Sequence, residues 1–111
     1  METKPIVEFS DFEKLDIRIG AVLSAERIPN SDKLLKLEVD FGLEKRQILT
    51  GMAEFYSPEH FVNKQFPFLL NIPVRKIRGL ESQGMLLSPD VNGVPTLFAL
   101  EKPVPNGSSL M

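Results

Sequence analysis

The sequence predicts an all-β fold: a small five-stranded Greek-key barrel of the OB type, with one short helix and a C-terminal extension. Apolar and polar residues alternate over several short segments, which is typical of strands with one buried face. Turn signals separate these segments, and one helix start falls between the third and the fourth. The length of 111 residues corresponds to a single domain over residues 1–111. An SH3-like barrel is the main alternative.

Residues 1–9 lack periodicity and are expected to form a loose arm or an edge strand. A capping box follows, in which the Ser10 hydroxyl accepts a bond from the backbone of Glu13 and the Glu13 carboxylate reaches back. This pattern predicts a short helical turn over residues 10–14.

Residues 16–28 alternate and predict a long strand. One face would carry Ile17, Ile19, Ala21, Leu23 and Ala25, opposite Arg18, Ser24 and Glu26. Gly20 lies inside this segment and predicts a bulge or a sharp bend. The turn signal Pro29-Asn30-Ser31-Asp32 ends the strand.

Two more strands are predicted over residues 34–41 and 46–50, with a turn at Gly42, so that the first three strands form an antiparallel meander. Ser57, Pro58 and Glu59 then indicate a helix start, with an N-cap serine, a proline in the first turn and an acid at the positive end of the helix dipole. This helix is expected to end at Asn63.

The second half of the chain contains three further apolar runs. Residues 66–72 are β-like, with prolines that indicate an edge or a kink, and residues 85–87 predict a short strand. A tight turn at Asn92-Gly93 precedes a predicted strand over residues 96–100. The tail over residues 103–107 is rich in proline and glycine and need not be regular.

The composition excludes several classes of protein. With 42% hydrophobic and 25% charged residues, the chain is neither disordered nor fibrous. It has no run of 18 apolar residues and no apolar leader, so we expect no membrane segment and no signal peptide. The absence of cysteine excludes disulfides and thiolate sites, and the expected compartment is the cytoplasm.

No constellation of residues indicates catalysis, so we expect no enzyme activity, no cofactor and no metal. His60 is the only histidine, whereas zinc takes three or four Cys, His or carboxylate ligands. No spacing of acidic residues suggests magnesium. The glycine-rich phosphate-binding motifs and the nucleophile elbow are also absent.

The distribution of charge is more informative than its total. The net charge of −2 argues at first against a nucleic-acid partner. Residues 60–80, however, contain four basic residues and no acidic one, and three of the four are Arg75, Lys76 and Arg78. Such a cluster makes a local positive potential even on an acidic protein. A solvated turn is the alternative interpretation.

Phosphate contact fits this cluster chemically. Guanidinium groups bind phosphate oxygens bidentately, and Gly79 would let a ligand approach the backbone. Lys33 and Lys36 extend the cluster if the loop over residues 29–34 folds beside it.

The aromatic residues favour recognition of nucleic-acid shape and backbone over base stacking. The chain has eight Phe, one Tyr and no Trp. OB-folds bind single strands by stacking bases on exposed aromatic side chains. Here most Phe lie on apolar faces and are expected in the core: Phe41, Phe66, Phe68 and Phe98. A second group flanks the predicted helix and could belong to the core or to an oligomer interface: Phe55, Tyr56 and Phe61.

Over about residues 10–107 the sequence resembles the tRNA-binding domain family. The most specific segment is Arg75-Lys76-Ile77-Arg78-Gly79-Leu80-Glu81-Ser82-Gln83-Gly84-Met85. Further matching segments are Asp16-Ile17-Arg18-Ile19-Gly20, Pro29-Asn30-Ser31-Asp32-Lys33-Leu34, Val39-Asp40-Phe41-Gly42, Arg46-Gln47-Ile48-Leu49-Thr50-Gly51 and Asn71-Ile72. The family includes small free-standing tRNA-binding proteins, the C-terminal or β-subunit domain of methionyl-tRNA synthetases and the domain at the end of endothelial-monocyte-activating polypeptide.

The resemblance implies an OB-fold with a C-terminal extension, a homodimer, and non-catalytic binding of tRNA through its shape and backbone. It also implies a possible role as an accessory domain or subunit of methionyl-tRNA synthetase. By motif position the tRNA-binding surface comprises Asn30, Lys33, Arg75, Lys76, Arg78, Ser82 and Met85, with Lys36 as an extension by charge. The cations would neutralise phosphates, Asn30 and Ser82 would donate or accept hydrogen bonds, and Met85 would make an adaptable apolar contact.

Two departures from the family pattern are mild, because neither removes a cation: Ile28 replaces the usual His, and Ser31 replaces Ala. Residues 14–18 and 103–107 are also similar to a sister branch, small bacterial chaperone-like proteins implicated in protein export. That branch shares the fold and the dimer and is thought to bind peptides. The alternative function is therefore a peptide-binding protein whose docking surface lies near Phe55 and Phe61.

Overall fold

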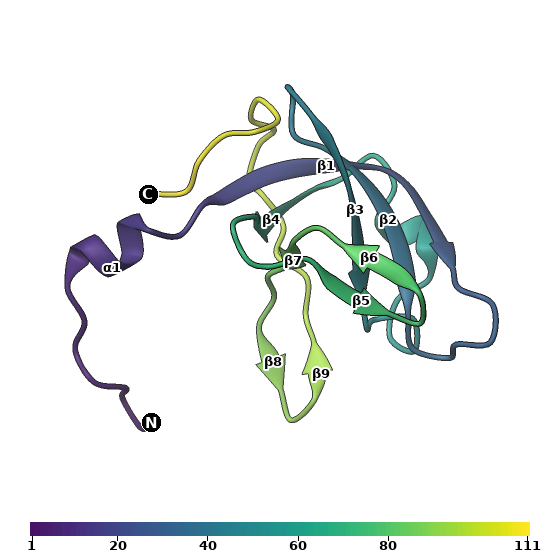
Figure 1. The fold of residues 1–111 in the computed structure, drawn as a ribbon, viewed down its shortest axis with the longest axis horizontal. Coiled ribbons are helices and arrows are strands. Elements are labelled where there is room, and N and C mark those ends of the chain that lie inside the picture. The colour runs from purple at the N-terminus through teal and green to yellow at the C-terminus, as the bar shows by residue number, and fades with distance from the viewer.

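A five-stranded antiparallel sheet, curled nearly into a barrel, forms the body of the protein in the computed structural model, which describes all residues 1–111 (Figure 1). The strand order is β3-β2-β1-β4-β7. These strands are β1 (Ile17–Arg27), β2 (Leu35–Asp40), β3 (Lys45–Thr50), β4 (Gln65–Leu69) and β7 (Met85–Leu86). The predicted all-β barrel and its antiparallel meander β1-β2-β3 are thereby confirmed.

Two small hairpins and two short helical segments complete the fold. The hairpins are β5 (Arg75–Ile77) with β6 (Leu80–Ser82), and β8 (Asp90–Val91) with β9 (Val94–Pro95). The helical segments are α1 (Phe9–Glu13) and the 3-10 helix η1 (Pro58–His60). The structure contains no helix with the length and hydropathy needed to cross a membrane.

The core fills the inside of the barrel and is rich in phenylalanine. Phe61, just after η1, is fully buried and closes one end of the barrel against Phe66 at 5.7 Å between ring centroids. Phe41 meets Phe68 edge to face at 5.4 Å, an arrangement that the ring quadrupoles favour. The core positions predicted for Phe41, Phe66 and Phe68 are confirmed, whereas Phe98 is 49% exposed and was wrongly assigned to the core.

The bulge in β1 lies at Leu23 and not at the predicted Gly20. The register with β2 shifts between Val22 and Ser24, so Val22 is fully buried while Leu23 is exposed. Before the bulge Gly20 and Val22 face the core, so the face predicted for this part of β1 is wrong. The bulge reverses the alternation, and Ala25, on the predicted face, packs against the core. Gly20 serves another purpose: a Cβ there would lie 2.5 Å from buried side-chain atoms of both Val39 and Phe41.

Two predicted helix and strand details are corrected by the structure. α1 begins at Phe9, and the Asp11 carboxylate accepts the bond from the Glu8 amide at 3.1 Å, so Ser10 and Glu13 form no capping box. Residues 96–100 form no strand; the turn at Asn92-Gly93 instead joins β8 to β9. η1 ends at His60 with Phe61 as its C-cap, so the predicted helix end at Asn63 is wrong; Asn63 has a left-handed φ of 64° in the turn that follows.

The C-terminal tail runs along the first half of β1 and covers it. Ile19 donates to the Ser108 carbonyl at 2.9 Å and accepts from Gly107 at 2.7 Å, while Leu110 donates to the Ile17 carbonyl at 2.9 Å. Ile19 is therefore buried by the tail and not by the barrel core. The extension is an integral part of the domain.

Gly20→Ala should destabilise the protein by about 1–3 kcal/mol, because the added methyl group overpacks the core between β1 and β2. Gly51→Ala is the matched control, since a Cβ there meets nothing within 4 Å. It should be neutral or stabilise by about 0.4–1 kcal/mol through the unfolded state. Urea unfolding measures both changes, and equal stabilities of the two variants would contradict this packing.

Candidate nucleic-acid interface

The cluster of basic residues forms the hairpin β5–β6, which the sequence did not predict as two strands. Its two-residue turn requires positive φ at both positions, and Arg78 and Gly79 have φ values of 52° and 79°. A non-glycine residue rarely adopts this conformation. Arg75, Lys76 and Arg78 are all exposed on this segment. Residues 75–82 are called the basic hairpin below.

The basic hairpin lies beside the loop over residues 29–34, which is the condition on which Lys33 and Lys36 were expected to extend the cluster. The Arg78 guanidinium donates from Nη1 to the Asn30 carbonyl oxygen at 2.9 Å. The loop itself is held in place, because the Leu34 amide donates to the Ser31 hydroxyl at 3.2 Å and the Lys33 carbonyl accepts from Ala53 at 2.9 Å. The structure thus brings Asn30 and Arg78 into direct contact and places Lys33 on the adjoining loop.

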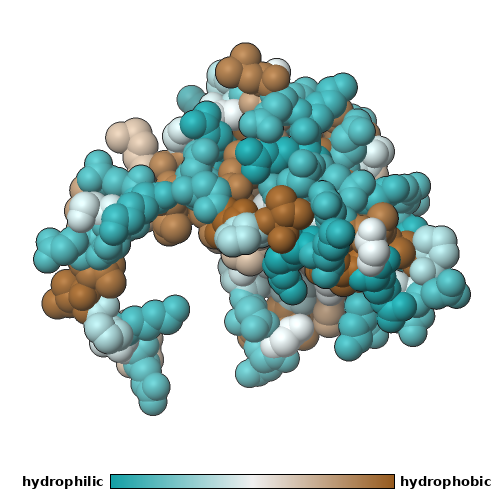
Figure 2. All heavy atoms as spheres, in the orientation of Figure 1, coloured by the Kyte–Doolittle hydropathy of each residue, from teal (hydrophilic) through white to brown (hydrophobic).

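The cations of this region are unpaired. The four ion pairs of the protein use Lys14, Arg18, Lys36 and Arg46. Lys33, Arg75, Lys76 and Arg78 have no carboxylate partner within 4.0 Å, so their positive charge faces solvent. Figure 2, in the orientation of Figure 1, shows hydrophilic side chains interspersed with apolar ones over β5 and β6.

Not every cation of the hairpin faces the same way. Arg75 pairs with Ser82 across the two strands, whereas Lys76 pairs with Glu81. Directly opposite residues of a hairpin project from the same face. Lys76 therefore lies beside an acidic side chain on the opposite face from Arg75, and its contribution to the positive potential is reduced.

Ser82 has a structural role that the sequence did not reveal. It is buried, its hydroxyl accepts a bond from the Leu49 amide at 3.0 Å, and it donates to the Gly84 carbonyl at 2.9 Å. The bond from Leu49 fastens the end of β6 to β3, and the bond to Gly84 holds the turn that follows β6. The Ser82 hydroxyl is therefore engaged within the protein, and its expected contact with RNA stays a prediction.

Met85 and Lys36 have different surroundings from the hairpin cations. Met85 follows the basic hairpin on β7 and is 41% exposed, so it is accessible beside the hairpin base. Lys36 is ion-paired with Glu26 at 2.7 Å across β1 and β2. The outer face around this pair also carries Glu38 and Lys45, so it is of mixed charge and does not extend an unpaired basic patch.

Gln47 and Gln83 were not predicted as important, yet they join β3 to the basic hairpin. The Gln47 amide donates to Gln83 Oε1, the Gln47 Nε2 donates to the Glu81 carbonyl, and the Gln83 amide donates to the Gln47 carbonyl, each at 2.9 Å. Polar residues in a strand are usually interpreted as a solvated face, so periodicity alone does not detect this role.

No other cluster offers a site for chemistry. His60 Nδ1 lies 3.2 Å from the Ser57 hydroxyl, and its ring packs against Tyr56. Hydrogen bonds from the backbone amide of Glu59 and from Ser57 hold the pKa of the exposed Glu59 carboxyl below its ordinary value. Nowhere do three or more His, Cys, Asp or Glu side chains gather as metal ligands would.

A family model described as "Putative tRNA binding domain" matches residues 17–109 of the chain. The chain is 48% identical over 110 residues to a methionine–tRNA ligase of Methanothrix thermoacetophila, covering 99% of this chain and 16% of that protein. It is 45% identical over 113 residues to the corresponding ligase of Parabacteroides distasonis, covering 98% and 17%. The chain therefore spans about one sixth of the length of these relatives.

Two similar solved structures cover almost the whole chain. A MetRS-related protein from Pyrococcus horikoshii has a TM-score of 0.93 at 37% identity, covering 97% of this chain and 100% of that one. The chaperone CsaA from Bacillus anthracis has a TM-score of 0.86 at 30% identity, covering 96% and 100%. One of these similar proteins is related to a tRNA synthetase and the other is a chaperone, which are the two classes of protein that the sequence resembles.

Proposed function

Since the chain belongs to the tRNA-binding domain family, we propose that it binds tRNA through the basic hairpin and the 29–34 loop, without catalysing a reaction. The observation that carries this proposal is the contact between Arg78 and Asn30. It joins two segments that are far apart in sequence into one surface whose cations have no carboxylate partner. Lys33, Arg75 and Arg78 then neutralise phosphates, with Lys76 as a weaker contributor.

The chemistry of this surface favours recognition of the RNA backbone. Exposed guanidinium and ammonium groups bind phosphate oxygens and release condensed counterions. β5 and β6 carry no aromatic residue on which a base could stack. Asn30 and the neighbouring backbone supply hydrogen bonds to phosphates or 2′-hydroxyls, and Met85 supplies an apolar contact. Such a surface reads the shape of tRNA and not its sequence.

The partner in the cell is proposed from the relatives. The chain corresponds to about one sixth of methionine–tRNA ligases, so it fits an accessory domain or subunit of that synthetase which adds affinity for tRNA. The cytoplasm is the matching compartment, because tRNA is used where proteins are synthesised.

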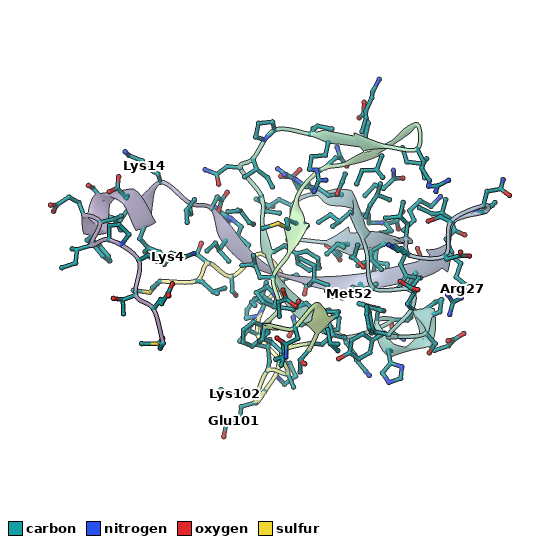
Figure 3. The ribbon with its side chains drawn as sticks, turned by 90° about the horizontal axis from the view of Figure 1, so that it is seen from below. Lys4, Lys14, Arg27, Met52, Glu101 and Lys102 are labelled. Carbon is teal, nitrogen blue, oxygen red and sulfur yellow. The ribbon has the colours of Figure 1, made fainter.

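Exposed apolar side chains at the N-terminus support a homodimer, because a second chain could bury them. The N-terminal arm, residues 1–8, and α1 stand apart from the barrel in Figures 1 and 3 and expose Ile6, Val7 and Phe9. The Asn71 side chain fixes the root of this arm, since it accepts from the Asp16 amide at 2.7 Å and donates to the Lys14 carbonyl at 2.6 Å. The arm is therefore directed away from its own barrel.

The barrel offers a surface that could receive such an arm. A cavity of about 670 Å³ between the C-terminal tail and the sheet is lined mainly by apolar residues, among them Ile19, Leu87, Phe98, Leu100 and Leu110. In a twofold dimer each chain would place its arm on the other, which satisfies both surfaces at once. Two basic hairpins on one dimer would then bind tRNA with greater avidity than one.

Peptide binding is the second candidate function, and the same apolar cavity is the observation that favours it. A chaperone shares the fold at 30% identity. The docking surface expected near Phe61 is corrected, because Phe61 is fully buried and only Phe55 is exposed. Suppression of aggregation of a denatured client protein, without tRNA binding, would favour this alternative.

Replacing both Arg75 and Arg78 with Ala should weaken tRNA binding and reduce the slope of log K against log salt concentration by about 1 to 2, because each phosphate contact adds to that slope. Titration of labelled tRNA at several salt concentrations measures the effect. The charge-matched control replaces Lys64 and Lys102, which line one cavity. Figure 3 shows Lys102 on the side of the molecule away from β5 and β6.

The control variant should bind with nearly the slope of the unchanged protein. No binding of tRNA at low salt would refute the proposed function. An equal loss of slope in both variants would show that binding depends on total charge and not on the basic hairpin.

Replacing Ile6 and Phe9 with Ser should convert the dimer to a monomer and weaken tRNA binding, because the arm then loses the apolar area that it buries on its partner. Leu43→Ser is the control, since Leu43 is fully exposed in the turn between β2 and β3. Sedimentation or light scattering measures the mass. A monomeric unchanged protein, or a dimer that survives the double substitution, would contradict this interface.

A further inference from the structure

We propose that Arg46 is a positioning residue for the basic hairpin, joining both ends of the segment that carries the hairpin to β3. The inference rests on the proposed function, since it explains how the tRNA-binding surface is kept in place. Arg46 belongs to β3 and is not part of the exposed basic cluster.

One nitrogen of Arg46 touches both ends of the segment that carries the hairpin. Its Nη1 donates to the Leu70 carbonyl at 2.9 Å and to the Gln83 carbonyl at 2.9 Å. Leu70 directly follows β4, where the chain leaves the sheet, and Gln83 directly follows β6, where the chain returns. The whole basic hairpin therefore lies between two points that a single guanidinium joins.

The guanidinium is itself fixed by Glu44. Arg46 Nε donates to Glu44 Oε2 at 3.1 Å, and Nη2 donates to Glu44 Oε1 at 3.4 Å. These contacts engage Nε, Nη1 and Nη2, every nitrogen of the group, and the Arg46 side chain is only 24% exposed. Arg46 is thus committed to contacts within the protein and is poorly placed to bind phosphate.

A lysine at this position could not do the same work. The planar guanidinium of arginine can donate to two carbonyl oxygens from one nitrogen and to a carboxylate from the other two. The ammonium group of lysine is a compact point charge and cannot make this set of bonds. One further bond between β3 and the hairpin region joins backbone to backbone, from the Gln83 amide to the Gln47 carbonyl. The other three run through the side chains of Gln47, Gln83 and Ser82. Side chains therefore determine where the hairpin lies.

Displacement of the hairpin would affect the whole tRNA-binding surface. Arg75, Lys76 and Arg78 all lie between Leu70 and Gln83, and the contact of Arg78 with Asn30 depends on the hairpin position. Loss of the Arg46 bridge should therefore weaken tRNA binding even when the positive charge is retained.

The test compares Arg46→Lys, which keeps the charge, with Arg46→Gln, which removes it. Both should weaken tRNA binding by about tenfold, the effect of losing one charge-assisted hydrogen bond. Lys45→Gln is the matched control, because Lys45 is the neighbouring exposed residue of β3 and has no ion pair. It should change the affinity by less than about threefold.

Hydrogen exchange supplies a measurement that does not depend on tRNA. In Arg46→Lys the backbone amides of the basic hairpin should exchange at least about ten times faster. The amides that are hydrogen-bonded between β1 and β2 should keep their protection. Should this variant fail to fold, Glu44→Gln removes the carboxylate that orients Arg46 and should produce the same pattern more weakly.

Wild-type affinity and unchanged hairpin exchange in Arg46→Lys would overturn the inference. A loss of binding in Arg46→Gln alone would show instead that Arg46 acts only through its charge. If the unchanged protein binds no tRNA, the proposed function fails, and the exchange measurement still decides whether Arg46 holds the hairpin.

Discussion

The contact between the edge of β3 and residues 82–84 is the constraint on which both the fold and the candidate site depend. The Ser82 hydroxyl bridges the Leu49 amide and the Gly84 carbonyl, and Gln47 and Gln83 exchange bonds through side chain and backbone. β3 and β7 are the edge strands of the sheet and are not paired with each other, so these bonds replace a regular strand pairing in closing the barrel. The same contact that encloses the core therefore also determines where the basic hairpin lies.

A protein with a net charge of −2 can carry such a surface because its charge is segregated. Carboxylates partner Lys14 at the end of α1, Lys36 on β2 and Arg46 on β3, whereas the cations of the basic hairpin and the 29–34 loop have no carboxylate partner. Salt screens the field of a small patch within about 8 Å at physiological ionic strength. Binding by one chain should therefore be modest and salt-sensitive, and duplication in a dimer would compensate.

The sequence predicted the parts of the fold that alternation determines and missed those set by tertiary contacts. β2 follows from its period-2 pattern, but the bulge at Leu23 leaves no local signal and reverses the face of β1. Charge located the basic cluster, yet its hairpin depends on Arg78 adopting a left-handed conformation. A motif position cannot distinguish a buried hydroxyl from an exposed one, so the link that Ser82 makes to β3 could not be predicted from the sequence.

The central claim is that the basic hairpin and the 29–34 loop form one tRNA-binding surface. It is tested most directly by titrating tRNA into isotopically labelled protein and following the backbone amide resonances. We expect the largest shifts at residues 29–34 and 75–82, with little change around the apolar cavity near Phe98 and Leu100. Shifts confined to that cavity, with an unperturbed hairpin, would contradict the account.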